Sequence, residues 1–287
     1  MPVTDVNYHD AIFVFLTILQ ILDKNHKNSK LVEILIAIHF LEMIKASHKF
    51  SWPAVRRYLL VTLALLLIGL AYLSFRWALA DVLAQQVWHQ LDKSQMPGHE
   101  LDAAQWQQTR DWLEDSVRLH PNYSANLELA EIFYLSAGNQ PAGLQDELGW
   151  HDSNELALSY TRRALMIKPT WPYLWNDLFL IKVALRQFDR ELTNGIERAV
   201  TLGPWEKSVQ YDIALTGLDY WDNLEPAAHQ WVAIAMDKAL VMQKNPQPLA
   251  DDILVHPNIG KLCMSVNEMP ENNLKMLARY CKQPQDG

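Results

Sequence analysis

The sequence has 287 residues, 49% of them hydrophobic and 20% charged, and its net charge is −8. This share of apolar residues suits a packed core and excludes a generally disordered chain. The acidic balance repels nucleic acid phosphates, so we expect no nucleic acid partner. The charge is uneven, because residues 1–76 carry a net +3 and residues 77–287 a net −11.

Residues 1–57 are predicted to form a cytoplasmic N-terminal segment. Its two apolar but interrupted stretches, Ala11–Leu22 and Leu31–Ile44, are each shorter than a spanning helix. Three interpretations stay open: an interfacial helical hairpin, two poor spanning helices, or an upstream extension over residues 1–42 that is not normally translated. Met43 can itself be a start followed by a short cationic leader, which favours the third.

The strongest signal in the chain is an apolar run over Leu59–Phe75 that contains no charged residue. At 1.5 Å per residue it spans most of the hydrocarbon core of a bilayer, so we predict a transmembrane helix over residues 58–76. The alternative to a transmembrane helix is a buried core helix of a soluble domain, but such helices rarely run this long with Leu on every face. A cleaved signal peptide is disfavoured because no clear cleavage site follows the run.

The charges that flank this run predict its orientation. The membrane-flanking residues are Arg56, Arg57 and Arg76, and further lysines lie only on the N-terminal side until Lys93. The positive-inside rule therefore places the N-terminus in the cytoplasm and residues 77–287 across the membrane. For a bacterium this predicts a single-pass inner membrane protein with a periplasmic main domain and membrane lipid as one partner.

Residues 77–99 are predicted to be a helical extension and linker. Val82, Val87 and Leu91 recur at near-helical spacing, so the anchor helix is expected to continue until Met96–Gly98 ends it. A second helix follows up to Leu119, with Asp102 as its N-cap. Its predicted apolar stripe contains Trp106, Leu113 and Val117.

A pattern that recurs along residues 100–225 predicts helical repeats. Each expected helix ends with a small residue five positions before a proline, in the pairs Ser116 with Pro121, Ala164 with Pro169 and Ala199 with Pro204. The small residue permits close approach of two helices, and the proline turns the chain into the next unit. An insertion rich in Gly and Pro, Gly138–Asp152, is predicted to be a loop.

These features predict an all-α protein: a single transmembrane helix followed by an α-solenoid of TPR-like helix pairs. Residues 226–287 are expected to form a C-terminal helical cap, with helices near Pro226–Lys244 and Glu271–Lys282. The array resembles the tetratricopeptide repeat, whose Leu-Gly-like pair corresponds to Leu129-Ala130, Leu178-Phe179 and Ile213-Ala214, with Trp175 near the first-helix Trp of that family. The first unit is too long for the repeat, and an irregular helical bundle is the alternative.

The two cysteines, Cys263 and Cys281, both lie near the C-terminus and belong to no metal-binding motif. They either form a disulfide that closes a short loop or are two buried free thiols. A disulfide persists in an oxidising compartment, which agrees with the orientation predicted from charge.

No recognised catalytic, nucleotide-binding or metal-binding motif occurs in the sequence, so we predict no catalytic residue, no metal and no cofactor. Aromatic residues are the most distinctive candidates for a binding groove. Rings stack on sugars and on peptides, so a lined groove could take a saccharide or a partner segment. Packing between repeat units is the alternative role for them. The candidate groove residues are Trp171, Tyr173, Trp175, Trp205 and Tyr211.

The layout also resembles a known family, the VpsP-type polysaccharide biosynthesis proteins of bacterial exopolysaccharide gene clusters. The likeness covers Met43–Lys282 and rests on the Cys pair and the segments RRYLLVTLALLLIGLAY, RALMIKPTWPYLWNDLFLIK and ERAVTLGPWEKSVQYDIALTGL. The resemblance implies a role in exopolysaccharide assembly or export. It implies envelope proteins of a polysaccharide machine as partners, with polysaccharide itself a further candidate, and it supplies no catalytic residues.

Three functions compete at this point. The first, which we favour, is a membrane-anchored periplasmic scaffold or adaptor in exopolysaccharide biosynthesis and export, and not an enzyme. The second is a TPR-like assembly factor for another envelope system, such as cytochrome maturation or pilus assembly. The third is a polysaccharide-modifying enzyme that uses a carboxylate which the sequence does not identify.

Overall fold

A computed structural model describes residues 52–94, 101–138, 149–243, 253, 255–267 and 274–282. Within these ranges all regular structure is helical and no strand occurs, which confirms the predicted all-α class. The chain divides into two compact units between Tyr72 and Leu73. The interpretations of residues 1–42, the helix stop at Met96–Gly98 and most of the predicted insertion loop lie outside the described residues.

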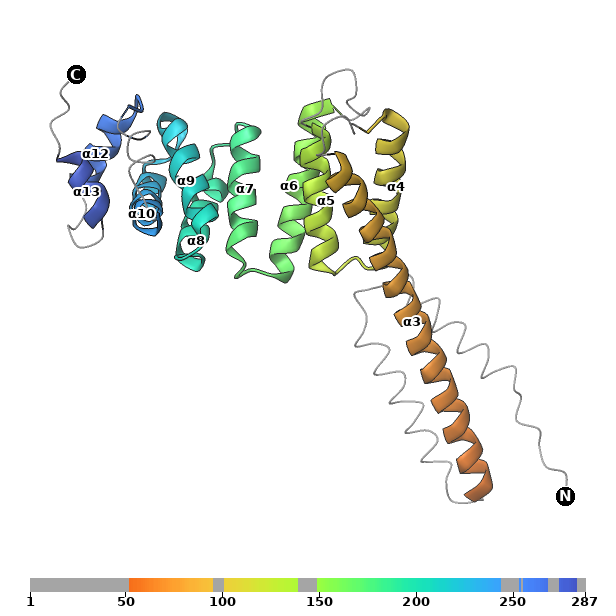
Figure 1. Cartoon of the computed structure of the whole chain (residues 1–287). Helices are drawn as coiled ribbons and strands as arrows, with labels where there is room; N and C mark the ends of the chain where they lie inside the picture. Colours follow the sequence, from red (N-terminus) through yellow and green to blue (C-terminus); the bar gives the residue numbers. More distant parts are fainter. Residues whose placement is uncertain are drawn as a thin grey trace, which may run out of the picture. The chain divides into compact units, whose positions relative to one another are not determined.

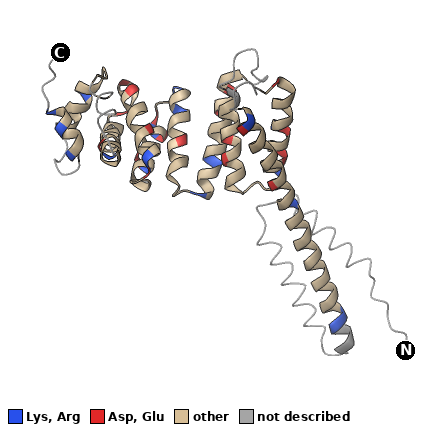
Figure 2. Cartoon of the chain, in the orientation of Figure 1, with Lys and Arg blue, Asp and Glu red and all other residues tan. Residues whose placement is uncertain are grey.

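Helix α3 covers Trp52–Ser94 and contains the predicted membrane segment. Figure 2 shows no charged residue on α3 between Arg57 and Arg76. The portion from Arg56 onward is long and apolar enough to cross a membrane, and none of its most apolar window is buried. Large side chains such as Leu66 and Ile68 are more than half exposed, which excludes the alternative of a soluble core helix. Among the described residues, α3 is the one candidate span.

The C-terminal turns of α3 belong to the second compact unit and carry a buried stripe. Its members are Ala80, Ala84, Val87 and Leu91, spaced four, three and four residues apart. This corrects the predicted stripe, because Val82 is 54% exposed and lies off that face. The small residues bring α3 close to its neighbour α4, where Ser116 Oγ donates a hydrogen bond to the Ala80 carbonyl oxygen at 3.0 Å.

Helix α4, Ala103–Leu119, begins with the predicted cap. The Asp102 side chain accepts a hydrogen bond from the Gln105 amide, and the Gln105 side chain accepts one from the Asp102 amide. This capping box satisfies two backbone donors at the start of the helix. The predicted stripe is also confirmed, since Trp106, Leu113 and Val117 are buried.

Three helix pairs follow, and Figure 1 shows them one after another in chain order. They are α5 with α6, Ser124–Gly138 and Gly149–Ile167; α7 with α8, Pro172–Ala184 and Arg190–Leu202; and α9 with α10, Lys207–Asp219 and Pro226–Met242. Neighbouring pairs contact each other through α6 and α7 and through α8 and α9. Residues 149–152 were expected to be loop but start α6, and α10 packs as the partner of α9 although it was assigned to the cap.

The three predicted repeat turns, Pro121, Pro169 and Pro204, lie between α4 and α5, α6 and α7, and α8 and α9. The small residues that precede them are fully buried, as close helix packing requires: Ser116, Ala164 and Ala199. The residues of the Leu-Gly-like pairs are buried as well. Membership of the tetratricopeptide repeat family stays a prediction.

Helix α7 is buried on two sides, which explains why its apolar residues are not confined to one face. Phe179 and Val183 belong to a core shared with α8, α9, α10, α12 and α13, whereas Leu174 and Leu178 belong to a core shared with α3–α6. Its C-terminus is closed by Arg186 in the left-handed conformation, with φ at 59°. The backbone N–H of Gln187 donates a hydrogen bond to the Lys182 carbonyl oxygen at 2.9 Å, as in a Schellman motif.

The close contact between α9 and α10 depends on Gly217. A Cβ atom placed there lies 2.5 Å from Val232 Cγ2, which is too close for a real contact. Gly217→Ala is therefore expected to lower the free energy of unfolding by about 1–2 kcal/mol, although Ala favours a helix by itself. Urea unfolding of the full chain in detergent, followed by circular dichroism, measures the effect.

Gly195→Ala is the matched control for this prediction. Its Cβ meets Leu178 Cδ2 at 2.9 Å, and this atom ends a side chain that can rotate. We expect a loss less than half of that for Gly217→Ala. A Gly217→Ala protein at least as stable as the wild type contradicts the packing argument.

The C-terminal helices pack on α10. They are α12, Ile259–Asn267, which was not predicted, and α13, Lys275–Cys281. A short 3-10 helix, η2, covers Trp221–Asn223 between α9 and α10. Asp237 of α10 accepts hydrogen bonds from the amides of Met276 and Leu277 at 2.8 and 2.9 Å and thereby caps α13. Cys263 and Cys281 form a disulfide that joins α12 to α13.

Candidate functional site

The turns before α7 and α9 carry two exposed tryptophans. Trp205 is 80% exposed and Trp171 is 45% exposed. The Trp171 ring lies 5.6 Å from that of Tyr173, and Lys168 Nζ lies over Trp171. The Tyr173 hydroxyl donates a hydrogen bond to Glu206, the residue after Trp205, so the two turns are adjacent. Exposed rings beside polar groups can contact a saccharide or a peptide.

The structure does not bring all five predicted groove aromatics together. Trp175 is half-buried and donates a hydrogen bond from Nε1 to the Pro169 carbonyl. Its ring lines a cleft of about 650 Å³ between α6 and α8, whose lining includes neither Trp171 nor Tyr173. Tyr211 is 38% exposed on α9. No ring contact joins Tyr211 or Trp205 to the other three residues within the described part of the chain.

The first helices of the three pairs carry acidic residues at matching positions. Glu128 of α5, Asp177 of α7 and Asp212 of α9 each directly precede one of the buried pairs that mark the repeat. Lys168 Nζ lies 2.9 Å from Glu128 Oε1, and Asn176 Nδ2 donates to Asp212 Oδ2 at 3.1 Å. We call Glu128, Asp177 and Asp212 the acidic row.

Burial perturbs two carboxyl groups of this row, those of Asp177 and Asp212, and the carboxyl group of one neighbour. Burial, together with the charges of Asp212 and Glu128, raises the pKa of Asp177 to about 7. Glu131 of α5 is 3% exposed. Burial, and to a smaller extent the charge of Asp177, raises its pKa well above the usual range, although a hydrogen bond from Thr161 lowers it. Burial also raises the pKa of Asp212.

These residues were not predicted from the sequence, because its acidic residues were interpreted only through their net charge. A signal was present, since an acidic residue recurs directly before Leu129-Ala130, Leu178-Phe179 and Ile213-Ala214. Carboxyl groups with raised pKa values can donate hydrogen bonds when protonated and can bind a cation when ionised. Among the described residues, no group of three or more His, Cys, Asp or Glu could hold a metal ion.

The raised pKa of Asp177 predicts stability that falls as the pH rises. The folded state favours the protonated carboxyl, so its contribution is complete below the ordinary pKa of 3.8 and is lost as the pH rises through about 7. Asp177→Asn removes this dependence. We expect the variant to exceed the wild type by about 2 kcal/mol in free energy of unfolding at pH 8 and to match it near pH 4.

Urea unfolding at both pH values measures this difference. Glu197→Gln, which neutralises an exposed carboxylate on α8, is the control and should show no such crossover. Equal stability of the wild type and Asp177→Asn at pH 8 contradicts the assigned burial.

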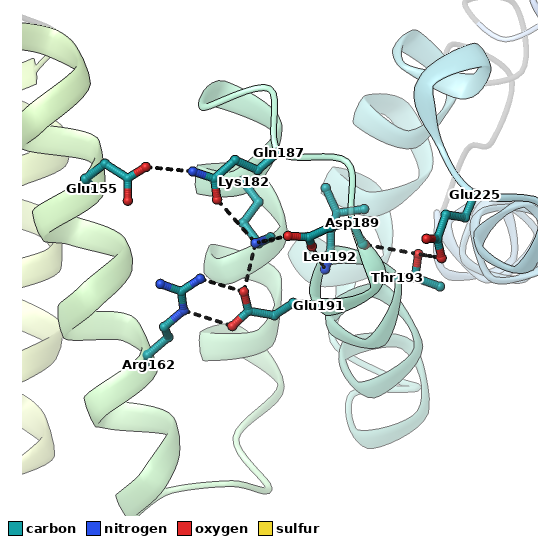
Figure 3. A network of polar contacts seen from close by, with 9 residues as sticks. All are labelled: Glu155, Arg162, Lys182, Gln187, Asp189, Glu191, Leu192, Thr193 and Glu225. Carbon is teal, nitrogen blue, oxygen red and sulfur yellow. Dashed lines mark hydrogen bonds and ion pairs between the residues drawn. The ribbon is translucent and has the colours of Figure 1, made fainter.

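A second polar cluster surrounds the fully buried Lys182 of α7 (Figure 3). Its Nζ lies 2.9 Å from Asp189 Oδ2 and 2.8 Å from Glu191 Oε2. Arg162 of α6 donates two hydrogen bonds to Glu191, at 2.9 and 2.6 Å. Gln187 Nε2 donates to Glu155 of α6 at 2.6 Å. The cluster ties α6, α7 and α8 together.

The pKa values in this cluster follow from its ion pairs. The hydrogen bonds from Arg162, and then those from Lys182, lower the pKa of Glu191 to about 2, although burial opposes them. Burial tends to raise the pKa of Asp189, but the hydrogen bond from Lys182 holds it below the usual value. A saturated network of this kind fixes the packing of neighbouring helix pairs, and we assign it no binding role.

No family model matches the chain, and no curated protein matches it either.

Proposed function

We propose that the protein is a membrane-anchored scaffold or adaptor that serves exopolysaccharide biosynthesis and export. The observation that carries the proposal is α3, whose apolar span is unburied and whose C-terminal turns share a hydrophobic core with α4 to α7. A helix of this kind holds a protein at a membrane, and an array of helix pairs offers an extended surface to partners. The exopolysaccharide system is proposed from the family resemblance.

The proposal places the N-terminus in the cytoplasm and residues 77–287 in the periplasm. Arg56 and Arg57 precede the span, while Arg76 alone follows it closely, and this bias supports the orientation. The Cys263–Cys281 disulfide agrees with an oxidising compartment. The proposed partners are envelope proteins of the polysaccharide machine, bound along the acidic row and the exposed tryptophans of the adjacent turns.

Gene deletion tests the proposed role in exopolysaccharide biosynthesis and export, and reporter fusions test the membrane topology. We expect deletion to reduce the amount or chain length of the exopolysaccharide and the full chain to restore it. Alkaline phosphatase is active only outside the cytoplasm, so it should be active when fused after Gly287 and inactive when fused after Arg57. Unchanged exopolysaccharide in the deletion strain contradicts the proposed system, and an active fusion at Arg57 contradicts the orientation.

A further inference from the structure

A cavity of about 180 Å³ lies between α5, α6 and α7 and is separate from the exposed tryptophans. Its volume is several times the roughly 30 Å³ that one water molecule occupies in the liquid, so it has room for a side chain. Most of the wall is apolar. The principal lining residues are Leu135 from α5, Trp150 and Asn154 from α6, and Asp177, Leu180 and Ile181 from α7.

Asp177 is the charged residue of this wall, and no cation pairs with it among the described residues. The cations of neighbouring segments are engaged elsewhere: Lys168 pairs with Glu128, and Lys182 pairs with Asp189 and Glu191. The charges nearest to Asp177 in the row are themselves negative. A carboxylate in a partly buried cavity without a counter-ion is a site that favours a cationic ligand.

We propose that this cavity takes a Lys or Arg side chain of a partner polypeptide, with the cation against Asp177. The inference rests on the proposed adaptor function and names the chemistry of its partner. Leu135 and Leu180 offer apolar surface to the methylene stem of such a side chain. Trp150 is partly exposed at the wall, and its ring offers a cation–π contact.

The wall favours a polypeptide side chain over a cationic sugar. An amino sugar carries several hydroxyl groups, and each one buried without a partner costs free energy. Among the described residues of the wall, Asn154, Asp177 and the Trp150 indole N–H are the polar side-chain groups, and Asn154 Nδ2 already donates to the Trp150 carbonyl at 2.8 Å. A Lys or Arg stem has no hydroxyl groups to satisfy. Further cations along the same segment would face Glu128 and Asp212, the other members of the acidic row.

Ligand binding to the purified full chain in detergent tests the proposal. The probe is N-acetyl-lysine-N-methylamide, and the neutral comparison is N-acetyl-norleucine-N-methylamide, which has the same stem without the ammonium group. Saturation-transfer NMR at pH 8, where Asp177 is ionised, measures both. We expect the lysine probe to bind at least tenfold more tightly than the norleucine probe. Asp177→Asn should remove that preference, and Glu197→Gln should retain it.

Equal binding of the two probes, or a lysine preference that survives in Asp177→Asn, overturns the proposal. Glucosamine that binds through Asp177 more tightly than the lysine probe overturns it in favour of an amino sugar. Because Asp177→Asn is expected to be more stable than the wild type at pH 8, lost binding is not explained by unfolding. The binding test is independent of exopolysaccharide production. If the lysine probe does not bind but the deletion strain still makes less or shorter exopolysaccharide, the cavity proposal is wrong and the scaffold proposal is unaffected.

Discussion

Neutralising both carboxylates that face Lys182, in an Asp189→Asn, Glu191→Gln variant, is expected to lower the free energy of unfolding by about 3–5 kcal/mol at pH 7. The Lys182 side chain is 1% exposed, and these two carboxylates are the charged partners of its ammonium group, whose further hydrogen bond goes to the neutral Gln187 Oε1 at 3.3 Å. Without them a charge stays buried and uncompensated, which is among the costliest changes in a protein. Asn at position 189 can still cap α8, so the loss reflects charge and not capping.

Lys182→Met is the matched control and is expected to cost only about 1 kcal/mol. Methionine keeps most of the volume of the stem, and the carboxylates left behind are 55% exposed at Asp189 and 37% exposed at Glu191, so water can solvate them. Adding Lys182→Met to the double variant should restore part of the lost stability. Thermal and urea unfolding of the full chain in detergent measure all three proteins. A Lys182→Met protein less stable than the double variant contradicts this account.

The pH dependence of the single Glu191→Gln variant provides a further check on the cluster. The folded pKa of Glu191 is about 2, below the ordinary value of 4.5, so its carboxylate stabilises the fold above pH 4.5. That contribution is lost as the pH falls through about 2. The variant should therefore be less stable than the wild type at pH 7 and should approach it near pH 2.

The arrangement of helices was largely predictable because one local pattern recurs along the chain. A small residue that permits close packing stands a fixed distance before each turn proline, and both roles follow from backbone geometry alone. Helix α12 was not predicted because its nine residues give little periodicity, and its pairing depends on α10 and on a disulfide. Val82 was misplaced because hydrophobicity alone did not show that Ala80 and Ala84 make the contact.

The candidate site was less predictable because its members come from different helices. Trp171 and Trp175 are four residues apart, a spacing that places two residues on one face only if both are helical. Trp171 is the N-cap of a helix that begins at Pro172, so the two rings serve different surfaces. The pKa of Asp177 depends first on its burial and then on the charges of Asp212 in α9 and Glu128 in α5, so it requires the packing of three helices and not only the recurring acidic position.

The disulfide between Cys263 and Cys281 is expected to hold the C-terminal helices in place. α12 and α13 have nine and seven residues, too few to be stable as isolated helices. They depend on the packing of Leu262 and Leu277, both fully buried, and on the contact of α13 with Asp237. A Cys263→Ala, Cys281→Ala variant should lower the free energy of unfolding of these helices by about 3 kcal/mol, as expected for a loop of this length.

Limited trypsin digestion locates the loss of stability. If the C-terminal helices open independently, cleavage at Lys261 and Lys275 should accelerate by about a hundredfold in the variant, because each 1.4 kcal/mol is a factor of ten. Cleavage at Arg190, in the α7–α8 pair, should not change. The wild type treated with a reducing agent should behave like the variant, because both lack the same bond. If cleavage at Arg190 accelerates equally, α12 and α13 do not open on their own and instead unfold together with the helix pairs.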